Sequence, residues 1–331
     1  MLSGFTTATS FLHVGSRFGD AHKGNSSFVL NDGGATTLAT MRTMSLRIPI
    51  ELAANCRKSP EREAWLARLP DVLRKLENEW ALTSDLPLDG EEPSCAYVAA
   101  VLSANKTPAV LKIAMPHMEG EHEIHGLRFW AGDPTVRLLR ADEDIGAMLL
   151  ERCHPGTTLR VLEERDQDVV ISGLLRRLWR WPSAEYPFRP LSALMEFWSS
   201  ETLMHAERWP DSELVREGLR LFKELPANAT REVLLATDLH AGNVLHAERE
   251  PWLVIDPKPF LGDPTYDATQ HLFNCWARMR SKPEETMRRL ADLLGMDYER
   301  LRLWMFARAA AEPRDDWSNG NRLELARAIA P

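Results

Sequence analysis

Apolar residues recur at helical spacing along residues 60–80, which read PEREAWLARLPDVLRKLENEW. Trp65, Leu69 and Leu76 fall on one face with charged residues between them, so an amphipathic helix is predicted. Pro70 lies inside this helix and removes one backbone hydrogen bond, so we expect an interruption there. Helical spacing returns further along the chain, in residues 120–132, 169–181, 192–208 and 211–225.

Short apolar runs of a different kind lie between the first two helical segments. Residues 95–103 (CAYVAAVLS) and 108–115 (PAVLKIAM) are separated by the turn-like ANKT, so they are predicted to form a hairpin. A further strand, residues 146–153 (GAMLLERC), ends at HPG, where we place a boundary. The predicted fold class is α+β, with a small sheet-bearing N-lobe (residues 44–152) before a larger, mainly helical C-lobe (residues 153–331).

The first 43 residues differ from this pattern. They are rich in serine, threonine and glycine and have neither helical nor strand periodicity. We interpret them as a mobile tail or a non-native extension, with Met44 as an alternative start of translation. The alternative is an extra strand docked on the body.

Polar residues interrupt an apolar stretch at residues 234–245, LLATDLHAGNVL. Buried polar groups are unfavourable unless they find partners, so Asp238, His240 and Asn243 call for an explanation. The role of Asp238 depends on the polar residues predicted to lie beside it. For the two histidines, His240 and His246, we expect hydrogen bonds within the loop.

A hairpin is predicted directly after this loop. If residues 243–247 and 252–256 are its arms around a four-residue turn, Asn243 and Asp256 are directly opposed, with Cβ atoms about 4.5 to 5.5 Å apart. Amide and carboxylate oxygens are hard ligands suited to Mg²⁺. Asp238 would lie beside them as a free carboxylate.

A metal held by Asn and Asp next to a free Asp is typical of phosphoryl transfer, which needs charge neutralisation and a base that accepts the proton of the acceptor hydroxyl. Lys112, in the strand-like AVLKI, supplies the cation in the manner of the kinase Val-Ala-Ile-Lys strand. We expect Glu123 on the following helix to hold this lysine. Glu119 and Glu121 are the alternatives.

The composition limits the classes of partner and site that we expect. The 331 residues include 48 acidic and 40 basic ones, and the net charge of -8 argues against a nucleic-acid partner. The four cysteines form no CxxC pair, so no zinc knuckle or disulfide framework is indicated and a reducing cytoplasm is expected. No apolar run approaches the roughly 18 residues that a membrane span requires.

Residues 234–274, together with 111–139 and 146–159, resemble the aminoglycoside/hydroxyurea phosphotransferase family, whose members include streptomycin 6-kinases. The resemblance implies a bilobal, protein-kinase-like fold that uses ATP and Mg²⁺. It implies the following roles: Asp238 as catalytic base, Asn243 and Asp256 as metal ligands, Lys112 on the α and β phosphates with Glu123 as its partner, and the backbone at Glu151 to Cys153 as the adenine-binding hinge.

Two features depart from the kinase pattern. Ala236 stands where kinase loops carry a histidine, so support for the loop must come from elsewhere; Asp267 is a candidate loop brace or N-cap. A G-x-G-x-x-G loop is missing, since LDGEEPSCAYV holds only Gly90. The phosphates are instead expected to meet backbone amides and the Ser94 hydroxyl.

The predicted function is ATP- and Mg²⁺-dependent phosphorylation of a hydroxyl on a small molecule, in the manner of an aminoglycoside or hydroxyurea antibiotic resistance kinase. The alternatives are a nucleotide-binding pseudokinase and a kinase of an unknown metabolic hydroxyl compound. Acidic residues of the C-lobe favour a polycationic acceptor; they are residues 163–168, Glu185, Glu196, Glu201 and Glu207.

Two other groups of residues are given structural roles. His117, His122 and His125 have no acidic or thiol ligand at fixed spacing, which disfavours a zinc site. Four tryptophans fit helix packing, and we expect them in the core: Trp179, Trp181, Trp198 and Trp209. The sequence does not indicate an oligomeric state.

Overall fold

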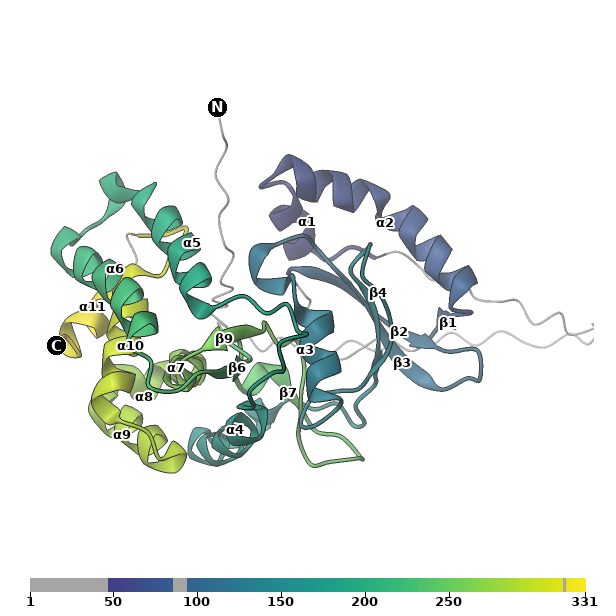
Figure 1. The fold of residues 1–331 in the computed structure, drawn as a ribbon. Helices are drawn as coiled ribbons and strands as arrows, with labels where there is room; N and C mark the ends of the chain where they lie inside the picture. Colours follow the sequence, from purple (N-terminus) through teal and green to yellow (C-terminus); the bar gives the residue numbers. More distant parts are fainter. Residues whose placement is uncertain (1–46, 86–93, 318–319) are drawn as a thin grey trace, which may run out of the picture.

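The computed structural model describes residues 47–85, 94–317 and 320–331, which form a sheet lobe and a helical lobe side by side (Figure 1). The predicted tail, residues 1–43, lies outside the described residues, as does Gly90. Among the described residues, no helix is long and apolar enough to cross a membrane.

Within the described residues, five strands form the antiparallel sheet of the first lobe, in the order β1-β2-β3-β5-β4. The predicted hairpin is confirmed, because β2 and β3 pair with Val98 opposite Lys112. The strands are β1 (Thr83–Ser84), β2 (Ala96–Leu102), β3 (Pro108–Ala114), β4 (Leu138–Asp142) and β5 (Ala147–Glu151). The sheet ends at Glu151; the boundary between residues 152 and 153 stays a prediction.

The two faces of the sheet are covered by different helices. Helix α2 (Pro60–Glu79), preceded by α1 (Ile50–Cys56), packs on one face through a cluster that includes Leu111 and Ile113 of β3. Helix α3 (Glu123–Trp130) packs on the other face. Because side chains alternate along a strand, Lys112 points to the face of α3.

Helix α2 is continuous through Pro70, so the predicted interruption is wrong. A proline inside a helix costs about 3 kcal/mol. On either side of it Leu69, Leu73 and Leu76 are buried against the sheet, each at most 4% exposed. Burying one leucine contributes roughly 1.5–3 kcal/mol, so packing outweighs the lost hydrogen bond.

The second lobe is mainly helical, as predicted. The three predicted helical stretches correspond to α4, α5 and α6, although α4 begins earlier than expected and ends before Trp179. The helices are α4 (Glu164–Leu178), α5 (Leu191–Leu203), α6 (Ser212–Ala227), α7 (Pro264–Asn274), α8 (Trp276–Ser281), α9 (Pro283–Leu294), α10 (Tyr298–Ala311) and α11 (Asn321–Ala328).

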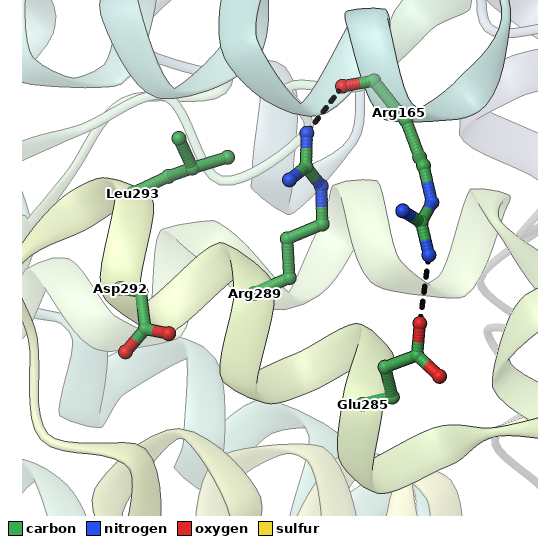
Figure 2. A pocket seen from close by; sticks show the side chains of 5 residues that line it. All are labelled: Arg165, Glu285, Arg289, Asp292 and Leu293. Atoms are coloured by element: carbon green, nitrogen blue, oxygen red, sulfur yellow. Dashed lines mark hydrogen bonds and ion pairs between the residues drawn. The ribbon is translucent and has the colours of Figure 1, made fainter.

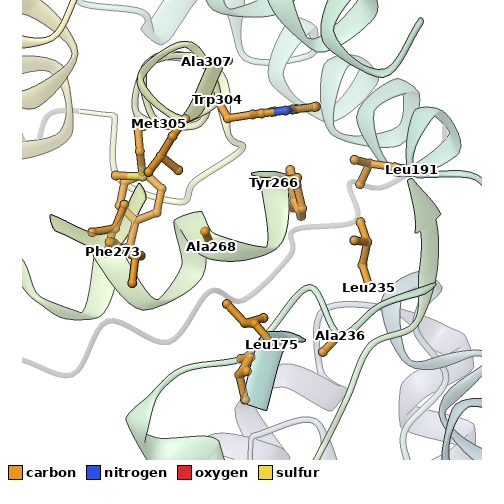
Figure 3. Packing of buried hydrophobic residues seen from close by; sticks show 14 of the residues in the cluster. Leu175, Leu191, Leu235, Ala236, Tyr266, Ala268, Phe273, Trp304, Met305 and Ala307 are labelled. Atoms are coloured by element: carbon orange, nitrogen blue, oxygen red, sulfur yellow. The ribbon is translucent and has the colours of Figure 1, made fainter. Parts of the chain in front are cut away.

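The core of this lobe lies where α7 contacts α10. Tyr266 of α7 and Trp304 of α10 meet edge to face, with ring centroids 5.1 Å apart, and both are fully buried (Figure 3). Of the four tryptophans expected in the core, Trp181 is 62% exposed, so that prediction is wrong for this residue. It follows the end of α4, where the helical periodicity no longer determines which side is buried.

Two short strand pairs complete the lobe: β6 (Val233–Leu235) with β9 (Phe260–Gly262), and β7 (Val244–Leu245) with β8 (Leu253–Val254). The β7–β8 hairpin is bonded to the rest of the chain on both sides. Val136, between α3 and β4, donates its backbone N–H to the Val254 carbonyl at 3.0 Å. On the other side His246 donates its N–H to the carbonyl of Thr157, after β5, at 2.8 Å.

Arg249 fixes the tip of this hairpin to the sheet lobe. Its guanidinium donates to both carboxylate oxygens of Glu151, each at 2.9 Å, and to the carbonyls of Gly132 and Thr135 at 2.9 and 3.1 Å. Charge-assisted bidentate pairs are strong and directional. The end of β5 and the hairpin therefore form one rigid unit.

Candidate active site

The loop between β6 and β7 presents Asp238 at the junction of the lobes. One carboxylate oxygen, Oδ1, accepts a hydrogen bond from Gln270 Nε2 at 2.7 Å, and the other, Oδ2, accepts from Asn243 Nδ2 at 3.3 Å. The side chain of Asp238 is 30% exposed, so a ligand can reach it. A carboxylate held in this way is suited to act as a base.

Asp267 braces the backbone of this loop. Its two carboxylate oxygens accept the N–H groups of Ala236 and Thr237 at 3.1 and 2.6 Å, and Trp179 Nε1 donates to it at 3.0 Å. Burial raises the pKa of Asp267 to about 6, although these donors favour the ionised form. The predicted brace is confirmed, and it supplies the support that Ala236 cannot give. The N-cap of α7 is Asp263 instead.

The predicted register of the β7–β8 hairpin is wrong by one residue. Val244 faces Val254, and Ile255 donates its N–H to the Asn243 carbonyl at 2.9 Å, so Asn243 lies opposite Ile255 and not Asp256. This pairing is incompatible with the four-residue turn assumed in the prediction, which considered local turn chemistry alone; the tip also contacts the sheet lobe through Arg249.

Asp256 nevertheless reaches the junction of the lobes. A slip of one residue turns a strand side chain to the opposite face. Asp256, however, lies beyond β8 and has a φ of +52°, a left-handed conformation that redirects its side chain. Its Oδ1 atom accepts from Lys112 at 2.5 Å and also from Lys258.

Lys112 and Glu123 form a buried ion pair between β3 and α3, as expected. The ammonium lies 2.6 and 2.7 Å from the two carboxylate oxygens, and the residues are 7% and 2% exposed. The two alternatives are engaged elsewhere: Glu119 accepts from an indole, and Glu121 pairs with an arginine. The pair is in place for nucleotide binding, a role that stays a prediction.

Charge compensation is tight around these groups. Burial raises the pKa of Asp256, but Lys112 and Lys258 outweigh it, so the net shift is downward. Burial alone would lower the pKa of Lys258, but the carboxylates of Asp256, Glu123 and Asp238 raise it. The pKa of Glu123 is raised, since burial exceeds the effect of Lys112.

Lys258 was missed by the sequence reasoning. It lies two residues after Asp256, and its backbone N–H donates to the Ala236 carbonyl at 2.8 Å, which brings it against the loop that carries Asp238. The lysine in DPKPF is a signal that could have suggested it.

The oxygen donors fit Mg²⁺. Asn243 Nδ2 donates to the Asp238 carbonyl at 2.9 Å as well as to its side chain, and within the described residues no hydrogen bond involves the amide oxygen of Asn243. Within the described residues, no hydrogen bond reaches Oδ2 of Asp256. One amide oxygen and one carboxylate oxygen are hard ligands of the kind that Mg²⁺ prefers.

The remaining predicted site residues lie along the sheet lobe. Ser94 lies two residues before the start of β2, and its carbonyl accepts from the Asn55 amide at 3.0 Å. Glu151 ends β5 and holds Arg249, while Cys153 is buried. Their contact with a nucleotide stays a prediction.

A hollow of about 410 Å³ between α4 and α9 lies apart from these residues (Figure 2). Arg165 donates to Glu285 at 2.7 Å across it, and Arg289 donates to the Arg165 carbonyl at 3.0 Å. Its lining shares no residue with the Asp238 site, so we assign no chemistry to it. The lining residues are Arg165, Glu285, Arg289, Asp292 and Leu293.

One buried group resembles a metal site: Asp168, His271 and Cys275. However, Asp168 accepts hydrogen bonds from Arg278 at 2.9 and 3.1 Å and from Arg289 at 3.0 Å. Two guanidinium groups already neutralise this carboxylate and would repel a cation. The group is therefore structural.

Replacing Asp267 by asparagine is expected to lower the free energy of unfolding by about 1–3 kcal/mol, because one amide oxygen cannot accept from three buried donors. We also expect kcat to fall about tenfold, since the loop that holds Asp238 loses its support. Denaturant unfolding and steady-state kinetics measure the two effects. Asp292→Asn, on the exposed side of α9, is the control and should change neither; an unchanged Asp267→Asn would contradict the bracing role.

A sheet lobe, a helical lobe, a buried Lys–Glu pair and an Asp–Asn–Asp set at their junction define a protein-kinase-like phosphotransferase of small molecules. The chain belongs to the aminoglycoside/hydroxyurea antibiotic resistance kinase family, whose model matches residues 79–314. Membership in this kinase family implies nucleotide use.

Relatives and solved structures agree with this assignment. The chain is 36% identical to a streptomycin 6-kinase of Streptomyces griseus, over 86% of this chain and 97% of that protein. It is also 36% identical to a hydroxyurea phosphotransferase of Kitasatospora aureofaciens, over 64% and 63%. A choline kinase from Streptococcus pneumoniae shares the fold at 14% identity, with a TM-score of 0.56 over 80% of this chain and 99% of that one.

Proposed function

We propose that the protein transfers the γ-phosphoryl group of ATP, bound with Mg²⁺, to a hydroxyl of a cationic, aminoglycoside-like acceptor. The observation that carries the proposal is the position of Asp238, held by Gln270 and Asn243 beside the cluster of Lys112, Glu123 and Asp256. Phosphoryl transfer depends on such positioning and charge stabilisation rather than on covalent catalysis by the protein.

Each residue has a defined part in this reaction. Asp238 accepts the proton of the acceptor hydroxyl as its oxygen attacks the γ-phosphorus and ADP leaves. Asn243 and Asp256 would hold the metal ion, which would neutralise phosphate charge. Lys112, oriented by Glu123, donates to the α and β phosphates, and we assign the buried ammonium of Lys258 to the γ-phosphate oxygens.

Two acidic residues, Glu119 near Asp238 and Glu201 on α5, favour a cationic acceptor. The pKa of Glu119 is raised by burial, against a hydrogen bond from Trp198, and the Asp238 carboxylate raises it further. Glu201, one turn after Trp198 on α5, is 5% exposed, and no hydrogen bond or ion pair within the described residues involves its side chain. Burial raises its pKa too. Guanidinium or ammonium groups would stabilise both carboxylates.

The experiment that tests the proposal is a mass-spectrometric screen for the gain of one phosphoryl group. Streptomycin, hydroxyurea, and a panel of sugars and amino alcohols are each incubated with Mg-ATP. We expect phosphorylation of a polycationic acceptor. Modification of a neutral metabolite would favour a metabolic kinase, and tight ATP binding without any product would favour a pseudokinase.

Ionic strength separates a cationic acceptor from a neutral one. At saturating Mg-ATP, KM for streptomycin should rise steeply between low and physiological salt, because screening weakens long-range attraction. KM for hydroxyurea, which is uncharged, should stay flat. Steady-state kinetics across a salt series measure both.

The matched variants for this series lie on one helix. Glu201→Gln removes the buried charge of α5 and should raise KM for streptomycin about tenfold, while Glu196→Gln removes an exposed charge and should leave it unchanged. Equal KM values for the two variants, together with a flat salt profile, would exclude an acidic subsite on α5 that binds a cationic acceptor.

A further inference from the structure

We infer that Gln270, held in place by Arg308, is a positioning residue that orients the carboxylate of Asp238 for proton transfer. The inference rests on the proposed role of Asp238 as the base. It starts from the hydrogen bond of 2.7 Å between Gln270 Nε2 and Asp238 Oδ1, the shortest one to this carboxylate among the described residues.

The chemistry of the neighbours decides which way the Gln270 amide points. Its oxygen accepts from Arg308 Nη2 at 2.8 Å. A guanidinium has only donors, so the amide oxygen must face Arg308 and the amide NH₂ must face Asp238. A reversed amide would place donor against donor at Arg308 and oxygen against carboxylate at Asp238.

The side chain of Arg308 is held by several contacts. It is 2% exposed, and its other nitrogen atoms donate to Glu312 at 3.0 Å and to the hydroxyl of Thr269 at 2.6 Å. Aromatic rings also surround the guanidinium, with centroids 5.0 to 5.4 Å away; they belong to Trp198, Tyr266 and Phe273. A buried, paired and stacked arginine fixes the geometry of whatever it binds.

Glu312 anchors the far end of this chain of contacts. It is 2% exposed and also accepts from Arg322 at 3.0 Å, so its charge is compensated from two sides. The sequence of contacts Glu312, Arg308, Gln270, Asp238 therefore connects the end of α10 to the catalytic loop through α7. Buried networks in which each member is satisfied are rigid.

At Asp238 the Gln270 bond works with that of Asn243. Gln270 reaches Oδ1 and Asn243 reaches Oδ2, so the plane of the carboxylate is fixed from two sides. His240 does not substitute for either donor: its Nε2 atom is 3.9 Å from Oδ1, and burial lowers its pKa. A base fixed in this way needs no reorientation when the acceptor hydroxyl arrives.

Helix α7 combines two functions. Asp267 holds the backbone of the catalytic loop, and Gln270, three residues later on the same face, holds its side chain. Within the described contacts, Gln270 has no hydrogen bond to Lys112, Glu123 or Asp256. Its loss should therefore affect the rate of transfer and not ATP binding.

The test compares two substitutions of Gln270. Gln270→Glu can still accept from Arg308 but cannot donate to Asp238, and it adds a like charge. Gln270→Met is similar in size and removes the donor without adding charge. We expect kcat to fall about 10- to 100-fold in both, most in Gln270→Glu, because a hydrogen bond to a charged group is lost. KM for ATP should stay within about twofold, since the nucleotide contacts are untouched.

Gln167→Met is the matched control. Gln167, on α4, is also a buried glutamine of the helical lobe, 7% exposed, but its amide donates to the carbonyl of Leu162, just before α4. Thermal unfolding of all three variants accompanies the kinetics. A fall in kcat no larger than that of Gln167→Met, or a parallel rise in KM for ATP, would overturn the inference. Asp238→Asn in the same assay separates the outcomes: if it is inactive while the Gln270 variants are not, only the positioning role fails.

Discussion

Replacing Asp238 by asparagine should lower kcat by at least about 100-fold, because a positioned general base contributes roughly 10² to 10⁴ to the rate. Mg-ATP binding should be retained, since Lys112, Glu123 and Asp256, the proposed nucleotide- and metal-binding residues, are not changed. Steady-state kinetics give the first quantity, and titration calorimetry with Mg-ATP gives the second.

The control for this substitution is Asp211→Asn. Asp211 caps α6 by accepting from Leu214 N at 3.2 Å, and asparagine is an equally good N-cap. Its kcat should equal that of the parent. If Asp238→Asn turned over at the rate of the parent, Asp238 would not be the base, and the roles proposed for its neighbours would have to be reassigned.

Removing the carboxylate of Asp256 should abolish the metal-dependent part of nucleotide binding. In Asp256→Ala one of the two expected oxygen ligands is missing, while Lys112 and Lys258 stay and still attract the phosphates. ATP should therefore bind the variant equally well with Mg²⁺ and with a chelator, whereas the parent should bind more tightly with Mg²⁺. We also expect kcat to fall at least about 100-fold, since charge stabilisation by the metal is lost.

Calorimetric titration with ATP, with and without Mg²⁺, measures this difference. Glu248→Ala removes an exposed carboxylate from the same hairpin and should bind as the parent does. A variant lacking Asp256 that still binds Mg-ATP more tightly than free ATP would show that the metal is held elsewhere.

The sequence was most informative where one element determines the position of a residue. Lys112 was correctly placed in a strand of the sheet lobe, because its apolar, partly β-branched run is a local signal, and Glu123 was correctly chosen as its partner on the next helix. Asp267 was predicted to be either a loop brace or an N-cap, and the structure shows the brace. Local patterns thus predicted the two lobes and part of the site.

Residues that depend on contacts between distant elements were not predictable in this way. The hairpin that follows the Asp238 loop contacts the sheet lobe through Arg249, whose partners are about a hundred positions away in the sequence, and its register was predicted wrongly by one residue. Gln270, on α7, reaches Asp238, which lies 32 positions earlier in the sequence, and no periodicity predicts that contact. Strand β4, with half-buried and exposed residues, lacks the apolar run that marked the other strands.

The β7–β8 hairpin is attached on both sides, and this limits which segments of two relatives can be combined into one active enzyme. Its backbone is hydrogen-bonded to Val136, before β4, and to Thr157, after β5. Arg249 also forms an ion pair with Glu151 at the end of β5. In a chimera that joins the sheet lobe of one relative to the helical lobe of another, the two sides of these hydrogen bonds would come from different parents. Recombination within the family should therefore yield active enzymes when Glu151, residues 132–136 and the hairpin descend from the same parent.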